Sequence, residues 1–139
     1  MVLVDASHAI MYVVGDDPFI GPRGTYEPRE RFNCKTKAVV YCIVCKKCGE
    51  LYVGETGRAL NVRFLEHRRD VLNKVANKEV ASHFNQEDHN GIEDMLVGGL
   101  RKINNLMDRK REEQKIIARL GCVLGRGMNT DFNFPFLLD

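Results

Sequence analysis

The stretch that decides the fold is residues 38–67, AVVYCIVCKKCGELYVGETGRALNVRFLEH. Residues 38–44 are rich in β-branched and aromatic side chains, and the run is short, which predicts a buried strand. A turn that carries cysteines follows, and residues 51–53 predict a second strand, so the two strands should form a hairpin. Gly57 then interrupts the pattern before a helix that we expect from about residue 58 to 74.

Further elements are predicted downstream of this stretch. A shorter helix is expected over residues 78–84, and a third strand over residues 94–100, although two glycines weaken that strand. Residues 105–120 predict a helix that stops at Gly121. This order predicts an α+β fold with a small, mainly antiparallel three-stranded sheet flanked by helices.

The chain of 139 residues has the length of one domain and a composition typical of globular proteins. Glycines and prolines between residues 15 and 28 interrupt every candidate element, so residues 1–36 are expected to form an irregular N-terminal arm. Residues 37–139 are then the folded domain. No apolar run approaches the roughly 20 residues that cross a bilayer, so no membrane partner is expected.

The net charge and the cysteine content limit the kinds of partner and site that the chain can have. The net charge of +2 is nearly neutral, so any contact with nucleic acid must rest on a local basic surface. The five cysteines are odd in number, and three of them fall within residues 42–48, which is a poor disulfide framework. Metal binding in a reducing compartment, nuclear or cytoplasmic, fits this pattern better.

Two cysteines and two histidines have the spacing of a metal site. Cys45 and Cys48 are separated by two residues, which lets both thiolates converge on one ion, and Gly49 tolerates the turn. His83 and His89 supply a second pair of ligands. Two sulfurs and two imidazoles complete a tetrahedron with no open position, which indicates a structural zinc ion that staples the hairpin.

Other interpretations of these residues stay open. The cysteines could be free thiols beside surface histidines. A redox pair is less favoured, because no helix directly follows the two cysteines to lower a thiol pKa. Cys42 could replace one of the four ligands, although its place inside the predicted strand favours the core.

Two tyrosines are expected to lie together on the hairpin. If the turn consists of only Lys46 and Lys47, residues whose numbers sum to 93 face each other, and Tyr41 lies opposite Tyr52. Aromatic packing alone would explain such a pair.

The first long helix places Arg63 and His67 one turn apart on one face. A lone histidine on an apolar face is usually a core residue whose ring nitrogens are hydrogen-bonded within the core. The neighbouring arginine favours a site that faces phosphate, because a guanidinium group matches phosphate oxygens.

The last helix carries a carboxylate in its apolar stripe, which we expect to contain Leu106, Ile116, Ile117 and Leu120. Glu113 projects from the middle of this stripe, whereas Glu112 points about 100° away. A carboxylate aimed at the core is costly unless it is paired or binds a metal. An ion pair with Arg63 or another base is one interpretation, and magnesium coordination beside a phosphate is the other.

Together these residues resemble the GIY-YIG endonucleases. The resemblance covers about residues 34–133 and rests on a short set of positions: Tyr41, Tyr52-Val53-Gly54, Arg63, His67, Glu113 and Asn129. The run from Val39 to His67 is most similar to the nuclease domain of Penelope-like retroelements, a group with a C-x-x-C between its tyrosine motifs and histidines downstream. The first motif, Val39-Val40-Tyr41, lacks the glycine of most members.

The resemblance implies a magnesium-dependent hydrolysis of phosphodiester bonds in DNA, as in retroelement integration. Glu113 would hold magnesium against the phosphate, and Arg63 would bind the phosphate. Tyr41 or Tyr52 would position or deprotonate the attacking water with the assistance of His67. By the same resemblance, Asn129 would brace the site, and a reverse transcriptase would be a partner of the domain.

A catalytic site of this kind requires its members to surround one cleft, with the zinc ion elsewhere. The first long helix also carries a local excess of basic residues for DNA: Arg58, Arg63, Arg68, Arg69 and Lys74 against Glu66 and Asp70. The competing hypothesis is a zinc-stabilised nucleic-acid-binding module that has lost its catalytic activity.

Overall fold

The computed structural model of the chain describes residues 2–5, 10–13, 19–28, 30–122 and 127–129. The strands in these ranges are β1 (Val2–Asp5), β2 (Ile10–Val13), β3 (Phe19–Ile20), β4 (Thr25–Tyr26), β5 (Val39–Cys45), β6 (Leu51–Thr56) and β7 (Met95–Lys102). The helices are α1 (Leu60–Leu72), α2 (Glu79–Phe84) and α3 (Leu106–Leu120), with a short 3-10 helix at Gly91–Asp94.

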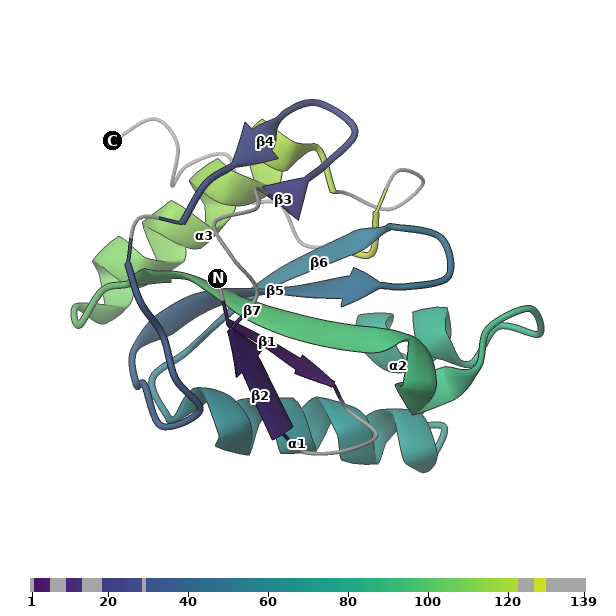
Figure 1. Cartoon of the computed structure of the whole chain (residues 1–139). Helices are drawn as coiled ribbons and strands as arrows, with labels where there is room; N and C mark the ends of the chain where they lie inside the picture. Colours follow the sequence, from purple (N-terminus) through teal and green to yellow (C-terminus); the bar gives the residue numbers. More distant parts are fainter. Residues whose placement is uncertain (1, 6–9, 14–18, 29, 123–126, 130–139) are drawn as a thin grey trace.

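The main sheet has five antiparallel strands in the order β2-β1-β7-β5-β6 (Figure 1). The expected α+β class and the helices are therefore confirmed, but the sheet is larger than the three strands predicted. The expected strands are its β7, β5 and β6, with β6 at the edge. Strands β1 and β2 extend the sheet beyond β7.

The N-terminal segment differs from the irregular arm that we expected over residues 1–36. It carries four short strands, of which β3 and β4 pair with each other in a separate small sheet. The glycines and prolines that interrupt this segment separate strands of two to four residues. Such strands are too short for a sequence pattern to reveal.

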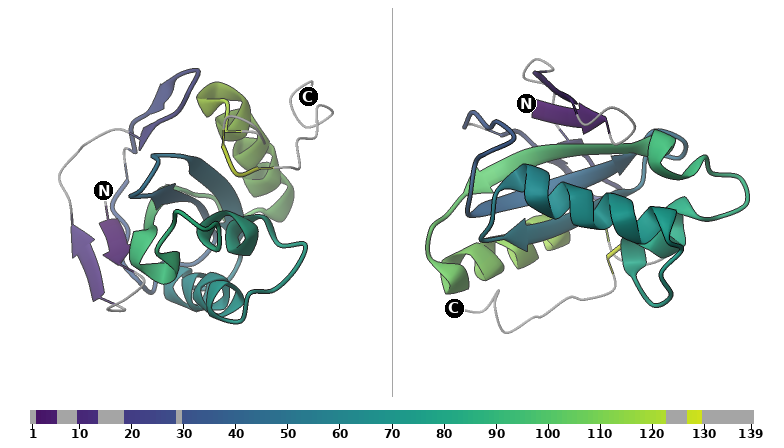
Figure 2. Two further views of the ribbon diagram at one scale, coloured as in Figure 1. Left: turned by 90° about the vertical axis from the view of Figure 1, so that its right-hand side faces the viewer. Right: turned by 90° about the horizontal axis from the view of Figure 1, so that it is seen from below.

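The two faces of the sheet are covered by different helices, as the views in Figures 1 and 2 show. Helices α1 and α2 lie on one face, where Val39, Tyr41 and Ile43 of β5 join one apolar core. Helix α3 lies on the other face, where Val40 and Cys42 join a second core. The alternation along β5 therefore feeds both cores, which explains why nearly the whole strand is buried.

The β5–β6 hairpin has a longer turn than predicted. Paired residues sum to 95 rather than 93, so Tyr41 lies opposite Gly54 and not opposite Tyr52. The turn spans residues 46–49, because Cys45 pairs with Glu50, and Gly49 adopts a φ of 78° to close it. The sum of the paired residue numbers differs from the predicted sum by two. Because side chains alternate between the two faces along a strand, an even shift leaves both tyrosines on the same face of the sheet.

Helix α3 begins and ends close to the predicted residues. Asn105 caps it by accepting a hydrogen bond from the Asp108 backbone N–H, and Gly121 ends it with a φ of 70°. Its buried stripe contains Ile116, Ile117 and Leu120, as expected, but Leu106 is 50% exposed. No helix in the described ranges has both the length and the apolar character of a membrane span.

Candidate functional site

The predicted metal ligands form one cluster. Cys45 ends β5 and Cys48 lies in the hairpin turn, while His83 comes from α2 and His89 from the loop after it. One ligand atom of each lies within 4.8 Å of the others. Four ligands around zinc are separated from one another by roughly 3.3 to 3.8 Å. The distance of 3.4 Å between Cys48 Sγ and His83 Nε2 already falls in that range.

Both imidazole rings are held by acidic or amide groups on the side away from the cluster. His83 Nδ1 lies 3.3 Å from a Glu50 carboxylate oxygen and 3.2 Å from the Gln86 amide nitrogen. His89 Nδ1 lies 2.8 Å from Asp88 Oδ1, and its Nε2 is buried without a hydrogen-bond partner. Such outer contacts orient histidine ligands, and the orphaned Nε2 is the atom that a metal would bind.

The Cys45 thiol keeps its proton unless a cation such as a metal ion replaces it. Burial raises its pKa to about 11, while the backbone N–H groups of Cys48 and Lys47 point at the sulfur and lower it. Cys42 lies in the second core, on the opposite face of β5, and does not belong to the cluster. Cys45, Cys48, His83 and His89 can therefore bind a metal ion such as zinc.

Four other predicted site residues meet at a second place on the α1 face. The Tyr41 hydroxyl lies 2.6 Å from His67 Nε2 and accepts a hydrogen bond of 3.2 Å from Arg63 Nε. The Tyr52 ring packs against the rings of Tyr41 and His67, with centroids 6.4 and 5.6 Å away. These four residues therefore lie together, but the tyrosines are diagonal neighbours and not directly opposite each other as predicted.

Charge states follow from the burial of this group. Burial, and then the charge of Arg63, lower the pKa of His67 to about 3, so the imidazole is neutral. Burial, and then Tyr52, raise the pKa of Tyr41 well above its usual range, so the phenol keeps its proton. The Tyr41 hydroxyl therefore donates to His67 Nε2 while it accepts from the Arg63 cation.

A small cavity of about 110 Å³ opens beside this group. Tyr52, Arg63 and His67 line it, and so do Asp70, Lys78, Glu79, Val80 and Ala81. Tyr41 and Glu113 do not line it, so the prediction of one cleft around all the catalytic candidates is only partly met. None of the four metal ligands lines the cavity, as expected.

Glu113 reaches this region from the other face of the sheet. Helix α3 contacts the edge strand β6, and Glu55 of β6 lies within electrostatic range of Glu113. Burial raises the pKa of Glu113 to about 7, with further contributions from the charges of Glu55 and of Glu79, which lines the cavity. The charge of Glu113 also contributes to the raised pKa of Tyr41. Its carboxylate is therefore within electrostatic range of Tyr41 but is not in contact with it, and its hydrogen bond of 3.0 Å comes from the Gln114 amide nitrogen.

Asn129 is buried and joins two segments of backbone. Its side chain accepts from the Val53 N–H and donates to the Val53 carbonyl, each at 2.8 Å. The Cys122 thiol also donates to its oxygen at 3.3 Å. Asn129 thus fixes β6 between the two tyrosine-motif positions Tyr52 and Gly54 and lies away from the cavity.

Several residues that shape the site were not predicted from the sequence. A Cβ atom at Gly54 would lie 2.5 Å from the Tyr41 hydroxyl, so only glycine leaves room for that phenol. Arg109 is 5% exposed and donates to Glu55 at 2.7 Å, which joins α3 to β6. Lys78 adds a second cation beside Arg63. Arg109 lies one turn before Glu113, and that spacing was the signal available in the sequence.

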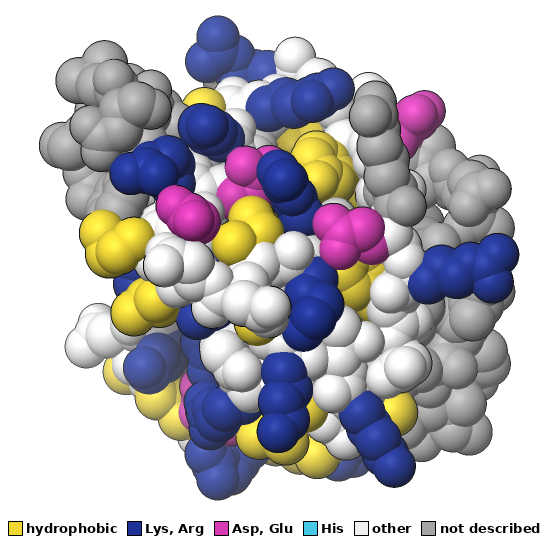
Figure 3. Space-filling model, turned by 90° about the vertical axis from the view of Figure 1, so that its left-hand side faces the viewer, with side chains coloured by type: hydrophobic (Ala, Val, Ile, Leu, Met, Phe, Trp, Pro, Cys, Tyr) yellow, Lys and Arg dark blue, Asp and Glu magenta, His cyan; other side chains and the backbone are white. Residues whose placement is uncertain are grey.

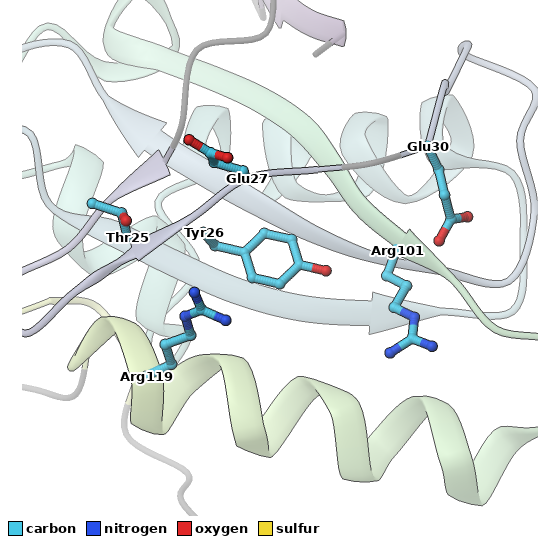
Figure 4. A pocket seen from close by; sticks show the side chains of 6 residues that line it. All are labelled: Thr25, Tyr26, Glu27, Glu30, Arg101 and Arg119. Carbon is cyan, nitrogen blue, oxygen red and sulfur yellow. The ribbon is translucent and has the colours of Figure 1, made fainter.

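A larger groove of about 630 Å³ lies on the α3 face (Figure 4). Its lining mixes cations and carboxylates: Thr25, Tyr26, Glu27, Glu30, Arg101 and Arg119. The Arg119 guanidinium lies 5.8 Å from the centre of the Tyr26 ring, and Arg101 pairs with Glu112 at 3.1 Å. The groove contains no predicted site residue.

Comparisons with known proteins add no relative: no family model, no curated protein and no solved structure matches this chain.

Proposed function

We propose that this chain is a metal-dependent endonuclease that hydrolyses phosphodiester bonds in DNA. The observation that carries the proposal is the Tyr41 hydroxyl, bonded at once to neutral His67 and to cationic Arg63 beside a small cavity. A phenol, a base and a guanidinium in contact are the groups that phosphodiester hydrolysis requires. The resemblance to GIY-YIG nucleases supports the same activity.

Glu113 is the residue that would hold magnesium. Its carboxyl group is largely buried near the carboxylates of Glu55 and Glu79, and its pKa is raised to about 7. A divalent cation would offset the unfavourable charge of such a carboxylate, which is why the residues fit the ion. Bound magnesium would supply Lewis-acid stabilisation of charge on the phosphate oxygens.

The remaining residues would each have a separate role in hydrolysis. Arg63 lines the cavity and would bind the scissile phosphate, with Lys78 as a second cation nearby. Tyr52 would position the attacking water. As that water attacks, its proton would pass to solvent through the open cavity, because a pKa of about 3 makes His67 a poor proton acceptor. His67 and Arg63 would instead hold the Tyr41 hydroxyl in place beside the cavity.

The metal cluster has a structural role in this proposal. Zinc held by Cys45, Cys48, His83 and His89 would have no open coordination position for substrate. It would tie the hairpin to α2 and so hold Tyr52 opposite the residues of α2 that complete the cavity. DNA and, in a retroelement, a reverse transcriptase are the partners that this function predicts.

A plasmid-nicking assay tests the proposal. Supercoiled DNA is incubated with the zinc-loaded chain in the presence and in the absence of magnesium. We expect relaxed and linear products only with magnesium. DNA binding without any nicking would favour the second candidate, an inactive binding module, which is supported by the absence of Tyr41 and Glu113 from the cavity lining.

A further inference from the structure

The end of the sheet where β5 begins collects basic side chains. Strands β6 and β7 both end there, because Val39 of β5 pairs with Thr56 on one side and with Lys102 on the other. The chain enters this end through residues 34–36, whose carbonyls accept from the first N–H groups of α1. Helices α1 and α3 both begin beside it.

Figure 3 shows many lysine and arginine side chains spread over one face of the molecule, with a few acidic side chains among them. The exposed cations that the strands and loops at this end of the sheet contribute are Lys35, Lys37, Arg58, Arg101 and Lys102. We call these five residues the basic end.

The members of the basic end differ in whether a carboxylate already neutralises them. Arg58 pairs with Glu66, and Arg101 pairs with Glu112. The three lysines have no carboxylate within ion-pair distance among the described residues. Lys102 Nζ donates only to the Lys37 carbonyl oxygen, at 2.7 Å, which holds the two lysines together. One carboxylate lies beside them, because Glu30 Oε2 accepts from the Lys102 backbone N–H at 3.1 Å. Three lysines against one carboxylate still leave a net positive surface, which suits a polyanion.

The position of the basic end relative to the catalytic candidates indicates which polyanion. Tyr41 is two residues from the start of β5, and Gly54 is two residues from the end of β6. Two residues of strand span roughly 7 Å. Duplex DNA carries one negative charge per about 1.7 Å of its axis, so about six phosphates fall within 10 Å along the axis on each side of any cleavage point.

We propose that the basic end binds the DNA duplex that flanks the scissile phosphate, with Lys35, Lys37 and Lys102 contacting its backbone. The proposal rests on the proposed nuclease function for the place of the scissile phosphate. It explains how a chain with a net charge of only +2 would bind DNA, because the positive charge is gathered on one end. Backbone contacts of this kind carry no sequence preference.

Salt-dependent binding tests this surface separately from catalysis. The full-length, zinc-loaded chain is titrated without magnesium into a labelled duplex of about 20 base pairs at several salt concentrations. Replacing Lys35, Lys37 and Lys102 with Gln should weaken binding about tenfold or more at moderate salt. It should also make the slope of log K against log salt shallower by roughly 3, since each lost phosphate contact removes about 0.9. A matched control replaces with Gln the residues Lys47, Lys115 and Arg119, which are exposed elsewhere and outside the basic helix α1, and should bind as the wild type does.

The outcomes separate the two proposals. If the triple variant binds and cleaves DNA like the wild type, the basic end is not the DNA surface, while the nuclease function stands. If the triple variant binds less and the wild type never cleaves, the nuclease function fails and the surface stands. Should the triple variant misfold, Lys35→Gln alone must still reduce the slope by roughly 1, and an unchanged slope overturns the proposal.

Discussion

At the scale of single residues, Tyr41 is the side chain on which the site converges. Tyr41 is 1% exposed, and its hydroxyl is hydrogen-bonded to both His67 and Arg63. Tyr41→Phe removes one oxygen and keeps the ring, so the core should survive. Because the buried His67 Nε2 loses its partner, we expect unfolding free energy to fall by about 1–3 kcal/mol.

Cleavage by Tyr41→Phe should fall by up to roughly 10²-fold, because Arg63 and His67 lose the hydroxyl that positions them beside the cavity. The control is Tyr26→Phe, which removes a hydroxyl that makes only a 3.4 Å bond to the Leu100 carbonyl on the other face. Single-turnover nicking rates compare the two variants. Equal rates for both would show that the Tyr41 hydroxyl has no part in the reaction.

Glu113 makes the stability of the protein depend on pH. Its carboxyl ionises near pH 4.5 in the unfolded chain but near pH 7 in the folded protein. Between these values the unfolded state binds fewer protons, so unfolding free energy falls as pH rises through this window. The contribution of protonated Glu113 to stability is fully present below about pH 4.5 and is lost above about pH 7. We expect the unfolding free energy to fall by on the order of 1–3 kcal/mol across this window.

Urea unfolding at pH 5 and pH 8, without magnesium, measures this effect. Glu113→Gln should be more stable than the wild type at pH 8, and the difference should shrink at pH 5. Glu112→Gln is the control, because Glu112 already pairs with Arg101. A difference between Glu113→Gln and wild type that is the same at both pH values would contradict the raised pKa.

At the scale of elements, the metal cluster connects the β5–β6 hairpin to α2. Cys48→Ser should lose the metal and lower the melting temperature strongly, because zinc binding and folding are coupled in small sites by about 10–16 kcal/mol of apparent binding energy. Cys34→Ser, outside the cluster, should retain one zinc ion per chain. Elemental analysis of both proteins checks this prediction, and a folded wild-type protein without zinc would refute it.

The same hairpin shows what the sequence could and could not predict. Composition located both strands, because a short run rich in β-branched residues is typical of a strand. The register was wrong because the turn was taken as Lys46-Lys47 alone, whereas the turn that joins the cysteines needs four residues and a left-handed Gly49. Tyr41 and Tyr52 still share a face, since an even shift preserves the side-chain alternation.

The helices show a second limit of sequence reasoning. Helical spacing predicted that Arg63 and His67 lie together, and both contact the Tyr41 hydroxyl. Helical periodicity also placed Glu113 on the buried stripe of its helix, but it cannot say which face of a sheet a helix covers. Helix α3 covers the face opposite α1, so Glu113 is within electrostatic range of Tyr41 but does not share one cleft with it.

At the scale of the whole molecule, the chain combines a metal cluster, a catalytic candidate group and a basic end on one small sheet. The metal ligands lie where β5 ends, and the basic end lies where β5 begins. Tyr41 lies between them. This arrangement would let a bound metal ion and the proposed DNA-binding surface act on either side of the site without sharing residues with it.

The most direct test of the central claim is the magnesium-dependent nicking rate of Glu113→Gln beside that of Glu112→Gln, with both proteins zinc-loaded and equally folded. The two glutamates are adjacent on α3 and the substitutions are chemically the same. Loss of nicking in Glu113→Gln, with DNA binding retained and with Glu112→Gln as active as the wild type, is the result that we predict. Nicking by Glu113→Gln at the wild-type rate would contradict the assignment of Glu113 as the magnesium ligand and, with it, the proposed nuclease site.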